Sequence, residues 1–346
     1  MPDSSLPMEC GLALHLLLRD VPVTVRTDSP QLLDVIKEYF APFIVQASSE
    51  EGRLVCVLQG TADVDTARLQ DLPGRRGKPP KESYYDTPNG RVVVKKRTGM
   101  VIYSDGPTRI VMGDAVAHVN QVINAIQQVY MEEHVDRDYF LLHAAAVASV
   151  HGDGVLIASP SGVGKSSAAL ATMDRGFKFM SNDRVLVQLA GTGARLVGVP
   201  KKPRINPGTV LALPSLHHLI PEPQRNEYAQ MEPDDLWRLE SKLDVDVESV
   251  YGRNALMLEA PLKYAFLLEW APGAGSPRIV RASLAEGVER LEKQLVNEGP
   301  YRPSPPPIPP TDVLAAMLSD SNVFLVKGGV DLAAFAAFAA EAAMKG

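Results

Sequence analysis

One stretch of the chain, residues 155–187, constrains the fold and the function more than any other. Val155–Ile157 is a short apolar run of the kind that forms a buried strand. Residues 167–175 are rich in Ala, Leu and Met, which favour a helix, and Gly176 follows where a C-terminal cap glycine is expected. A second apolar strand then leads to Asp183. The stretch therefore predicts a strand, a glycine-containing loop, a helix and a second strand that ends in an acid.

The loop before the helix has the pattern Ser-x-x-x-x-Gly-Lys-Ser, which is a P-loop (Walker A) motif except that Ser159 replaces the first glycine. Gly162 and Gly164 let the backbone turn its N–H groups toward phosphate oxygens, and the following helix adds its N-terminal partial charge. Lys165 would reach the outer phosphates, and the Ser166 hydroxyl would ligate magnesium. We therefore expect a nucleotide to be bound by the whole loop: Ser159, Pro160, Ser161, Gly162, Val163, Gly164, Lys165, Ser166 and Ser167.

Asp183 stands at a strand end beyond the helix, where phosphoryl-transfer proteins need a carboxylate for their metal. The alternative is a chance Gly/Ser loop without function. The strand before the loop, the helix after it and the acid beyond argue against that alternative. We expect ATP as the nucleotide, and Mg²⁺ held by Ser166 and Asp183.

These residues resemble the catalytic domain of HPr kinase/phosphorylase and its relatives. The likeness lies in Gly154–Ile157, in the loop that ends at Ser166, in Asp183–Val185, and in His143, which resembles the family's active-site histidine. It is close over about residues 140–190. It implies an α/β fold with a P-loop kinase domain of the HPr kinase / PEP carboxykinase-like type, preceded here by a small α+β N-terminal domain.

The branch of the family is indicated by a second run, residues 198–208, which is similar to the HPr-kinase-related proteins of the kinase B type. The Glu-Val-Arg-Gly stretch that true HPr kinases carry after their P-loop is absent from the sequence. HPr itself is therefore not the expected acceptor. A hydroxyl of another protein serine, or of a small molecule, stays open.

The resemblance also implies catalytic roles, with one departure at Asn182. The family has two successive acids where this chain has Asn182-Asp183, and the first acid is usually given the role of general base. An amide cannot accept a proton, although its oxygen can orient a hydroxyl or a water. Three options stay open: Asp183 serves both metal and base, His143 takes the proton, or a loose transition state needs little base help. The expected catalytic set is Asp183, His143, Lys165 and Asn182 of an ATP-dependent phosphotransferase.

Two other functions compete with this kinase hypothesis. The first is a nucleotide-binding regulatory protein with little or no phosphotransfer, which Ser159 and Asn182 both favour. The second is a PEP-carboxykinase-like enzyme. It would need a manganese-binding set of His, Lys and Asp that the sequence does not display.

A proline-rich basic run follows the expected hairpin over residues 185–199. Its prolines remove backbone donors and fix φ, so a regular helix is excluded there. The run is either a rigid clamp for a substrate phosphate or acid, or a structural corner. If it is a clamp, the binding side chains are Lys201, Lys202 and Arg204.

The length of 346 residues indicates two domains, and we place them at 1–137 and 138–346. The first part shows an early hairpin, a strand meander over residues 91–111 and a long amphipathic helix that ends near Arg137. We expect it to form the small α+β domain, and the second part to form the kinase domain. The resemblance also allows a homo-oligomer.

The net charge of −6 argues against a broad nucleic-acid or membrane surface. No apolar run reaches the ~18 residues needed to cross a bilayer, and the N-terminus is a poor signal peptide. The two cysteines give no support for a disulfide framework. A cytoplasmic location is therefore expected, with ATP and the acceptor as partners and with neither nucleic acid nor membrane.

Overall fold

The computed structural model describes residues 10–46, 52–72, 79–191, 193–296, 302 and 308–345. The chain is a mixed α/β protein with several sheets. It divides into two compact units: residues 1–137 with 297–306, and residues 138–296 with 307–346.

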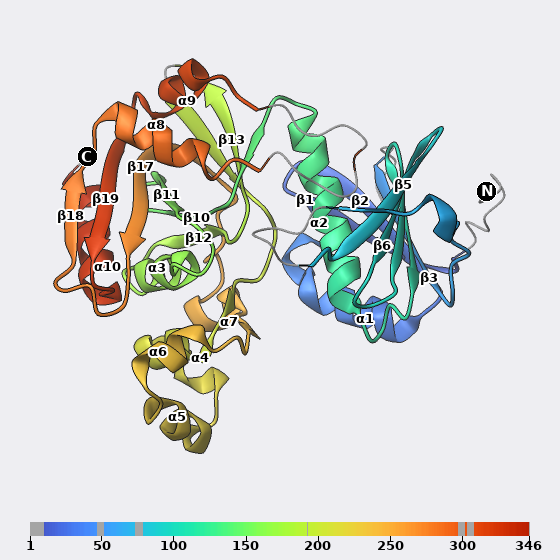
Figure 1. Ribbon diagram of the computed structural model, residues 1–346, viewed down its shortest axis with the longest axis horizontal. Coiled ribbons are helices and arrows are strands. Elements are labelled where there is room, and N and C mark those ends of the chain that lie inside the picture. The colour runs from blue at the N-terminus through green and yellow to red at the C-terminus, as the bar shows by residue number, and fades with distance from the viewer. Residues whose placement is uncertain are drawn as a thin grey trace. The chain divides into compact units, whose positions relative to one another are not determined.

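The first unit contains an eight-stranded sheet with the order β1-β2-β3-β8-β7-β6-β5-β4 (Figure 1). Strands β2 and β3 run parallel, as do β3 and β8, and the other neighbours are antiparallel. The strands are β1 Leu12–Leu18, β2 Val21–Thr27, β3 Arg53–Gln59, β4 Gln70–Asp71, β5 Glu82–Thr87, β6 Gly90–Lys95, β7 Val101–Asp105 and β8 Thr108–Gly113. The expected hairpin and meander are therefore confirmed.

Two helices pack on this unit's sheet, α1 Pro30–Tyr39 and α2 Val119–Val135. Helix α1 begins at Pro30, which occupies the first turn, and the Ser29 hydroxyl accepts the N–H of Leu32. Helix α2 packs against β2, β3 and β8 and buries its apolar side chains there. The alternation of buried residues along β1 and β2 matches a sheet with one covered face.

The second unit contains a nine-stranded mixed sheet in which β17 is central. Strand β17 runs parallel to β11 and to β19, and its first residues pair antiparallel with β14. Beyond β11 the sheet continues through β10 to β12, and beyond β14 it continues through β13 to β9. Strand β18 pairs with β19. The strands are β9 Phe140–Leu142, β10 Ala144–Ala148, β11 Gly154–Ala158, β12 Lys178–Ser181, β13 Val185–Ala190, β14 Gly193–Gly198, β17 Glu259–Trp270, β18 Arg278–Arg281 and β19 Asn322–Gly328.

Helices cover both faces of this sheet and give it two apolar cores. Helices α3 Lys165–Met173 and α10 Leu332–Lys345 cover one face, and α8 Leu284–Glu292 and α9 Thr311–Leu318 cover the other (Figure 1). Val155 and Ile157 of β11 point into the first core, and Leu156 between them points into the second. The continuous apolar run in β11 is explained by this burial on both faces.

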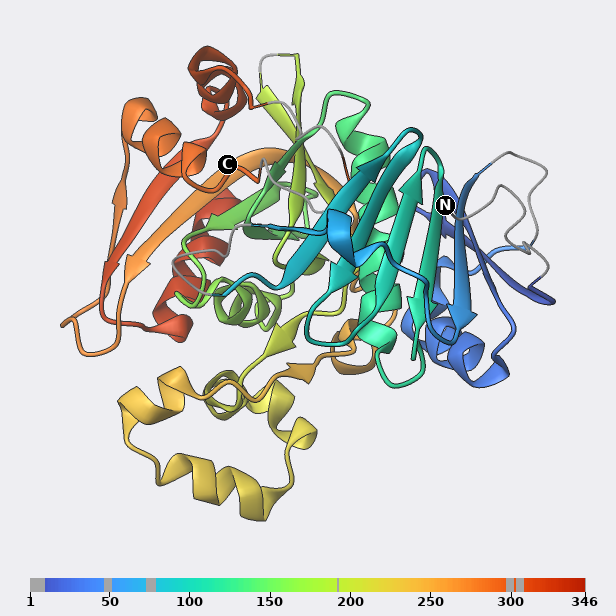
Figure 2. The ribbon, with the colours of Figure 1, turned by 45° about the vertical axis from the view of Figure 1, so that its right-hand side comes forward.

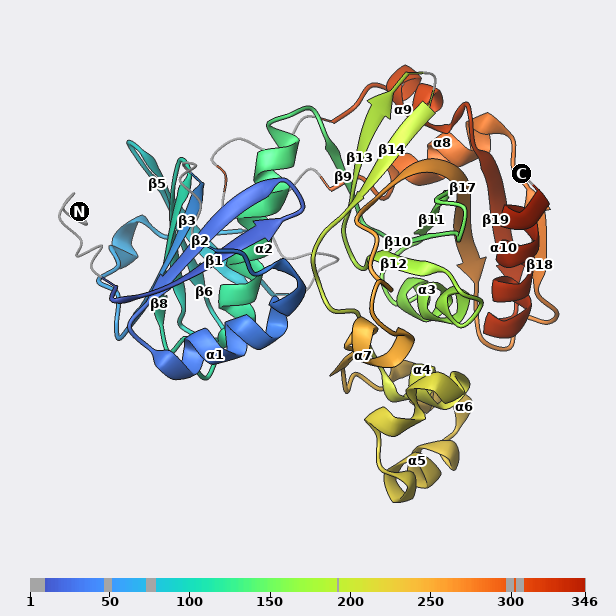
Figure 3. The same cartoon turned by 180° about the vertical axis from the view of Figure 1, so that it is seen from behind.

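A helical excursion leaves the sheet after β14 and returns at β17. It holds α4 Pro207–Ala212, the short 3₁₀ helix Pro214–Leu219, α5 Glu222–Ala229, α6 Pro233–Arg238 and α7 Val247–Tyr251. A two-stranded ribbon, β15 Arg204–Ile205 and β16 Leu243–Asp244, closes its base. Figures 2 and 3 show α4, α5 and α6 gathered on the side of the unit where α3 lies.

The strand pair before the loop is interrupted at His143. Strands β9 and β10 are separate and pair with different neighbours, although the apolar sequence runs through both. His143 lies at the break, and its backbone N–H donates to the carbonyl of Gln294. The break therefore frees the His143 side chain from the regular alternation of the sheet. Within the ranges given above, no helix has the length and apolarity needed to span a bilayer.

Candidate functional site

Three parallel strands of the second unit, β11, β17 and β19, end at the same edge of the sheet. Ligands of α/β sheets commonly bind in the crevice beyond the carboxyl ends of such strands. A cavity of about 920 Å³ lies at this edge. The loops after these strands contribute to its lining, and so do the ends of β9 and β12 and the helical excursion: His143, Gly162, Lys165, Ser166, Asn182, Asp183, Lys201, Arg204, Thr209, Trp237, Lys242, Gly273 and Val330, among others.

The loop between β11 and α3 has the conformation that its glycines predict. Gly162 has φ +86° and Gly164 has φ +105°, both in the left-handed region that other residues rarely adopt. A Cβ added at Gly162 would meet no atom within 4 Å, so the backbone angle and not crowding requires glycine there. Helix α3 has no side-chain cap at its N-terminus. Its first-turn N–H groups are therefore suited to an anion.

Lys165, the first residue of α3, is only 7% exposed although it lines the cavity. Its ammonium Nζ donates to the carbonyl oxygens of Ser159 at 2.8 Å and of Pro160 at 3.1 Å. A nearly buried charge needs such partners, because desolvation without hydrogen bonds is costly. Carbonyl oxygens of the loop therefore bind the Lys165 ammonium, which the motif predicts to bind the phosphates of a nucleotide.

The chain's two tryptophans both approach this loop at Gly164. The indole Nε1 of Trp270, at the end of β17, donates to the carbonyl of Val163 at 2.7 Å. Trp237, on α6, reaches Gly164 from the helical excursion. Neither tryptophan is predicted to be a site residue from the sequence alone. The rarity of tryptophan in this chain and the position of Trp270 at a strand end were the available signals.

Ser166 and Asn182 form a direct pair, in which the Ser166 hydroxyl donates to the Asn182 side-chain oxygen at 2.6 Å. Asn182 is 5% exposed. Ser166 and Asp183 are the residues predicted from the sequence to hold magnesium, and both line the cavity. The partner that the structure gives Ser166 is nevertheless Asn182, because Asp183 turns toward the basic side of the site.

Asp183 is surrounded by positive groups. Its carboxylate lies 3.4 Å from His143 Nε2, 3.3 Å from Arg184 Nη1 and 3.7 Å from Lys201 Nζ. Burial alone would raise the pKa of Asp183, but the His143 hydrogen bond and the charges of Arg184 and Lys201 hold that pKa far below its usual range. Its backbone is left-handed, with φ +71°, which Asp tolerates better than most residues. The carboxylate is therefore ionised at neutral pH.

His143 and Lys201 both have pKa values below their ordinary ones. The hydrogen bond to Asp183 raises the pKa of His143, but burial and the charges of Lys165 and Arg184 together outweigh it. Burial is the main cause that lowers the pKa of Lys201, and the nearby Asp183 opposes it. The imidazole of His143 is therefore neutral at pH 7, where it can accept a proton.

The basic residues that follow β14 do not all line the cavity. Lys201 and Arg204 line the cavity, and Arg204 also pairs with Asp244 across the β15–β16 ribbon at 3.0 Å. Lys202 is not among the lining residues, and its ammonium pairs with Asp246 at 2.8 Å. The expectation that Lys202 binds substrate has no support from this position. Lys242, which the sequence analysis did not single out, lines the cavity from the end of the excursion.

Three oxygen donors suited to a hard cation line the cavity. They are the Ser166 hydroxyl, the Asn182 amide oxygen and the Asp183 carboxylate. Magnesium is commonly held by one or two carboxylates together with substrate phosphates, so this donor set fits it. Among the residues that the structure describes, no group of three or more His, Cys, Asp and Glu is placed to hold a metal by itself.

Comparison with known proteins gives a likeness to solved structures. No protein-family model and no curated protein matches the chain. Among solved structures, the chain is similar to the Hpr(Ser) kinase/phosphatase from Coxiella burnetii, with 14% sequence identity and a TM-score of 0.30. The likeness covers 60% of this chain and 99% of that protein. At this TM-score it assigns neither fold nor activity to this chain, and the kinase B branch stays a prediction.

Proposed function

We propose that the cavity binds ATP with magnesium, and that the chain transfers the γ-phosphoryl group of ATP to a hydroxyl of an acceptor. One observation carries the proposal: an uncapped helix N-terminus, a left-handed glycine loop, a lysine and an ionised aspartate all face one cavity. Its volume of about 920 Å³ lies within the range of small-molecule sites.

The phosphates would be bound by the loop and by the start of α3. Lys165 would exchange the carbonyls of Ser159 and Pro160 for phosphate oxygens, which form stronger, charge-assisted hydrogen bonds. Ser166 and Asp183 would hold magnesium, with the Asn182 oxygen beside them. The ion, when bound, neutralises charge on the phosphates and so favours their transfer.

In the transfer step, the acceptor oxygen forms a bond to the γ-phosphorus while the bond from that phosphorus to the β–γ bridging oxygen breaks. ADP leaves with the electron pair of the broken bond. The proton of the acceptor hydroxyl passes to the neutral imidazole of His143, because Asp183 has too low a pKa to be an effective base. Asn182 can orient the hydroxyl but cannot take its proton.

The acceptor side of the cavity is basic. Lys201, Arg204 and Lys242 line it in addition to Lys165. Cationic side chains of this kind bind phosphate or carboxylate groups. We therefore propose that the acceptor carries an acidic group next to its hydroxyl, whether it is a small molecule or a serine in an acidic segment of a protein.

The test is incubation of the purified chain with γ-labelled ATP, magnesium and a cellular metabolite pool or protein extract. We expect label to move from ATP to an acceptor, and Lys165→Ala to abolish the transfer. Saturable binding without transfer to either pool would favour the second candidate, a nucleotide-binding regulatory protein, for which the neutral Asn182 beside Ser166 is the supporting observation. Absence of ATP binding would overturn both.

A further inference from the structure

Helix α6 places an exposed aromatic surface beside the phosphate-binding loop. The exposed fraction of Trp237 is 38%, whereas Trp270, which also approaches Gly164, is 3% exposed. A Cβ added at Gly164 would lie 3.7 Å from the Trp237 ring and 3.6 Å from the Trp270 ring. Trp270 is thus part of the core, while Trp237 presents its ring to the cavity.

Trp237 belongs to a small apolar surface that we call the α6 shelf, formed by Pro233, Leu236 and Trp237, all of which line the cavity. The shelf is supported from behind by α4, because a Cβ added at Gly208 would lie 3.4 Å from the Leu236 side chain. Helix α6 begins at Pro233, and proline favours the first turn of a helix.

A continuous set of contacts joins the shelf to the loop. The hydroxyl of Ser167, in the first turn of α3, lies 2.6 Å from that of Thr209 on α4, and α4 carries the glycine against which Leu236 packs. The shelf is apolar and aromatic, whereas Lys201, Arg204 and Asp183 make the rest of the rim charged. A ligand with phosphates in the loop and an uncharged ring system would therefore place its ring on the shelf.

We propose that the α6 shelf binds the nucleobase, with the base stacked on the ring of Trp237. This subsite rests on the proposed function, since it assumes a nucleoside triphosphate in the loop. Stacking of a base on an aromatic side chain is typically worth on the order of 10- to 100-fold in affinity. Because every base has a π-face, the shelf would strengthen binding without selecting strongly among bases.

The test compares two probes, Mg-ATP and Mg-tripolyphosphate, which share the phosphate chain and differ in the nucleoside. Titration calorimetry is carried out on the wild type, Trp237→Ala, Trp237→Phe and Arg238→Ala. We expect Trp237→Ala to weaken ATP by about 10- to 100-fold and to leave tripolyphosphate unchanged. Trp237→Phe should keep most of the ATP affinity. Arg238, exposed on the same helix and not a lining residue, is the matched control and should alter neither probe.

A fluorescence measurement keeps the test decisive if Trp237→Ala folds poorly. ATP should quench the tryptophan emission of the wild type more than that of Trp237→Phe, and tripolyphosphate should not distinguish them. Equal losses for both probes in Trp237→Ala, or no loss for ATP, would overturn the subsite. Equal wild-type affinity for the two probes would overturn the shelf and leave the phosphate site standing. Failure of both probes to bind the wild type would refute the proposed function itself.

Discussion

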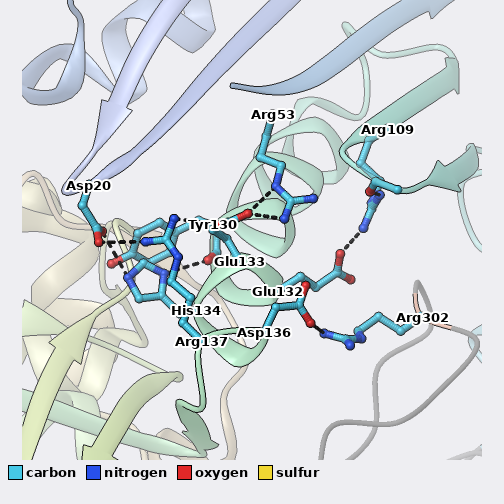
Figure 4. A network of polar contacts seen from close by, with 11 residues as sticks. Asp20, Arg53, Arg109, Tyr130, Glu132, Glu133, His134, Asp136, Arg137 and Arg302 are labelled. Carbon is cyan, nitrogen blue, oxygen red and sulfur yellow. Dashed lines mark hydrogen bonds and ion pairs between the residues drawn. The ribbon is translucent and has the colours of Figure 1, made fainter. Parts of the chain in front are cut away.

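The two units each hold a histidine beside an aspartate, and the pairs differ in what surrounds them. In the first unit, His134 Nε2 lies 3.2 Å from Asp20, and its Nδ1 lies 3.0 Å from the carbonyl oxygen of Tyr130 (Figure 4). In the second, His143 lies 3.4 Å from Asp183. The His134 side chain is fully buried, whereas that of His143 is 20% exposed and faces the cavity. Only the second pair is therefore placed to meet a ligand.

The charged groups around the two histidines also differ in their balance of positive and negative charge. In the first unit, each carboxylate of the network has an arginine partner, as in Arg109 with Glu132 and Arg53 with Glu133 (Figure 4). In the second, the cavity is lined by four cations and two carboxylates: Lys165, Lys201, Arg204 and Lys242 against Asp183 and Asp331. Removing one partner from a balanced buried network destabilises the fold, whereas an excess of charge of one sign in a cavity favours a ligand of the other sign.

The largest effect on function is expected when the charge of Asp183 is removed. Asp183→Asn keeps the size and tolerates φ +71°, so the backbone should not change. Without the carboxylate the site loses its charged oxygen donor, and phosphotransfer should fall on the order of 10³-fold. The measurement is the rate of γ-phosphate transfer, with a thermal melt as control. Full activity of Asp183→Asn would show that Asp183, like Asp20, has only a structural role.

Glu132 tests the other cluster. It is buried with Arg109, and Glu132→Ala would leave that arginine uncompensated, so the free energy of unfolding should fall by about 3–5 kcal/mol. Chemical denaturation measures this loss, and affinity for Mg-ATP should not change. Asp136→Ala, which removes a more exposed partner of Arg302, is the control and should cost at most about 1 kcal/mol. Loss of ATP binding in Glu132→Ala would contradict the separation of roles.

The two histidines should also respond differently to pH. Burial lowers the pKa of His134, so the unfolded chain takes up a proton that the folded chain excludes as pH falls below about 6.5. Stability should therefore decrease on acidification, by up to about 1.4 kcal/mol per pH unit, and His134→Gln should reduce the slope. His143 changes the stability with pH in the same direction, because its pKa in the folded chain is also lowered. Bound Mg-ATP should change the NMR titration of His143 and leave that of His134 unaltered. A shift in His134 alone would contradict this assignment.

The smallest effect is expected at Asn182. Asn182→Asp still offers an oxygen to the Ser166 hydroxyl and restores the acid that the resembled family carries. Turnover should stay within about 10-fold of the wild type or increase, because a positioned base supplies only part of the acceleration. Asn182→Ala, which loses the contact with Ser166, is the comparison. If Asn182→Asp were as inactive as Asn182→Ala, the amide itself would be required.

Local sequence predicted the part of the site that lies close together along the chain. The loop, α3 and Asp183 follow one another within 30 residues, and the pairing of Leu142 with Val185 then brings His143 to Asp183. The partner of Ser166 was not predicted, because side-chain direction after a strand end depends on the left-handed turn at Asp183.

The residues from the helical excursion were missed for a different reason. Trp237 and Lys242 lie in short helices and turns without a strong period, some 70 residues beyond the loop. Their position is fixed by packing of α6 on α4 and by the β15–β16 ribbon. That same ribbon turns Lys202 toward Asp246. Such long-range contacts leave no local pattern in the sequence.

The central claim is that the loop around Gly164 holds the phosphates of ATP through Lys165. Calorimetric titration of Mg-ATP into the wild type and into Lys165→Ala tests it directly, with melting temperatures measured alongside. We expect saturable binding to the wild type and a loss of about 10- to 100-fold in the variant, the size of a removed charge-assisted contact. Unchanged affinity in a folded Lys165→Ala, or no heat with the wild type, would contradict the account.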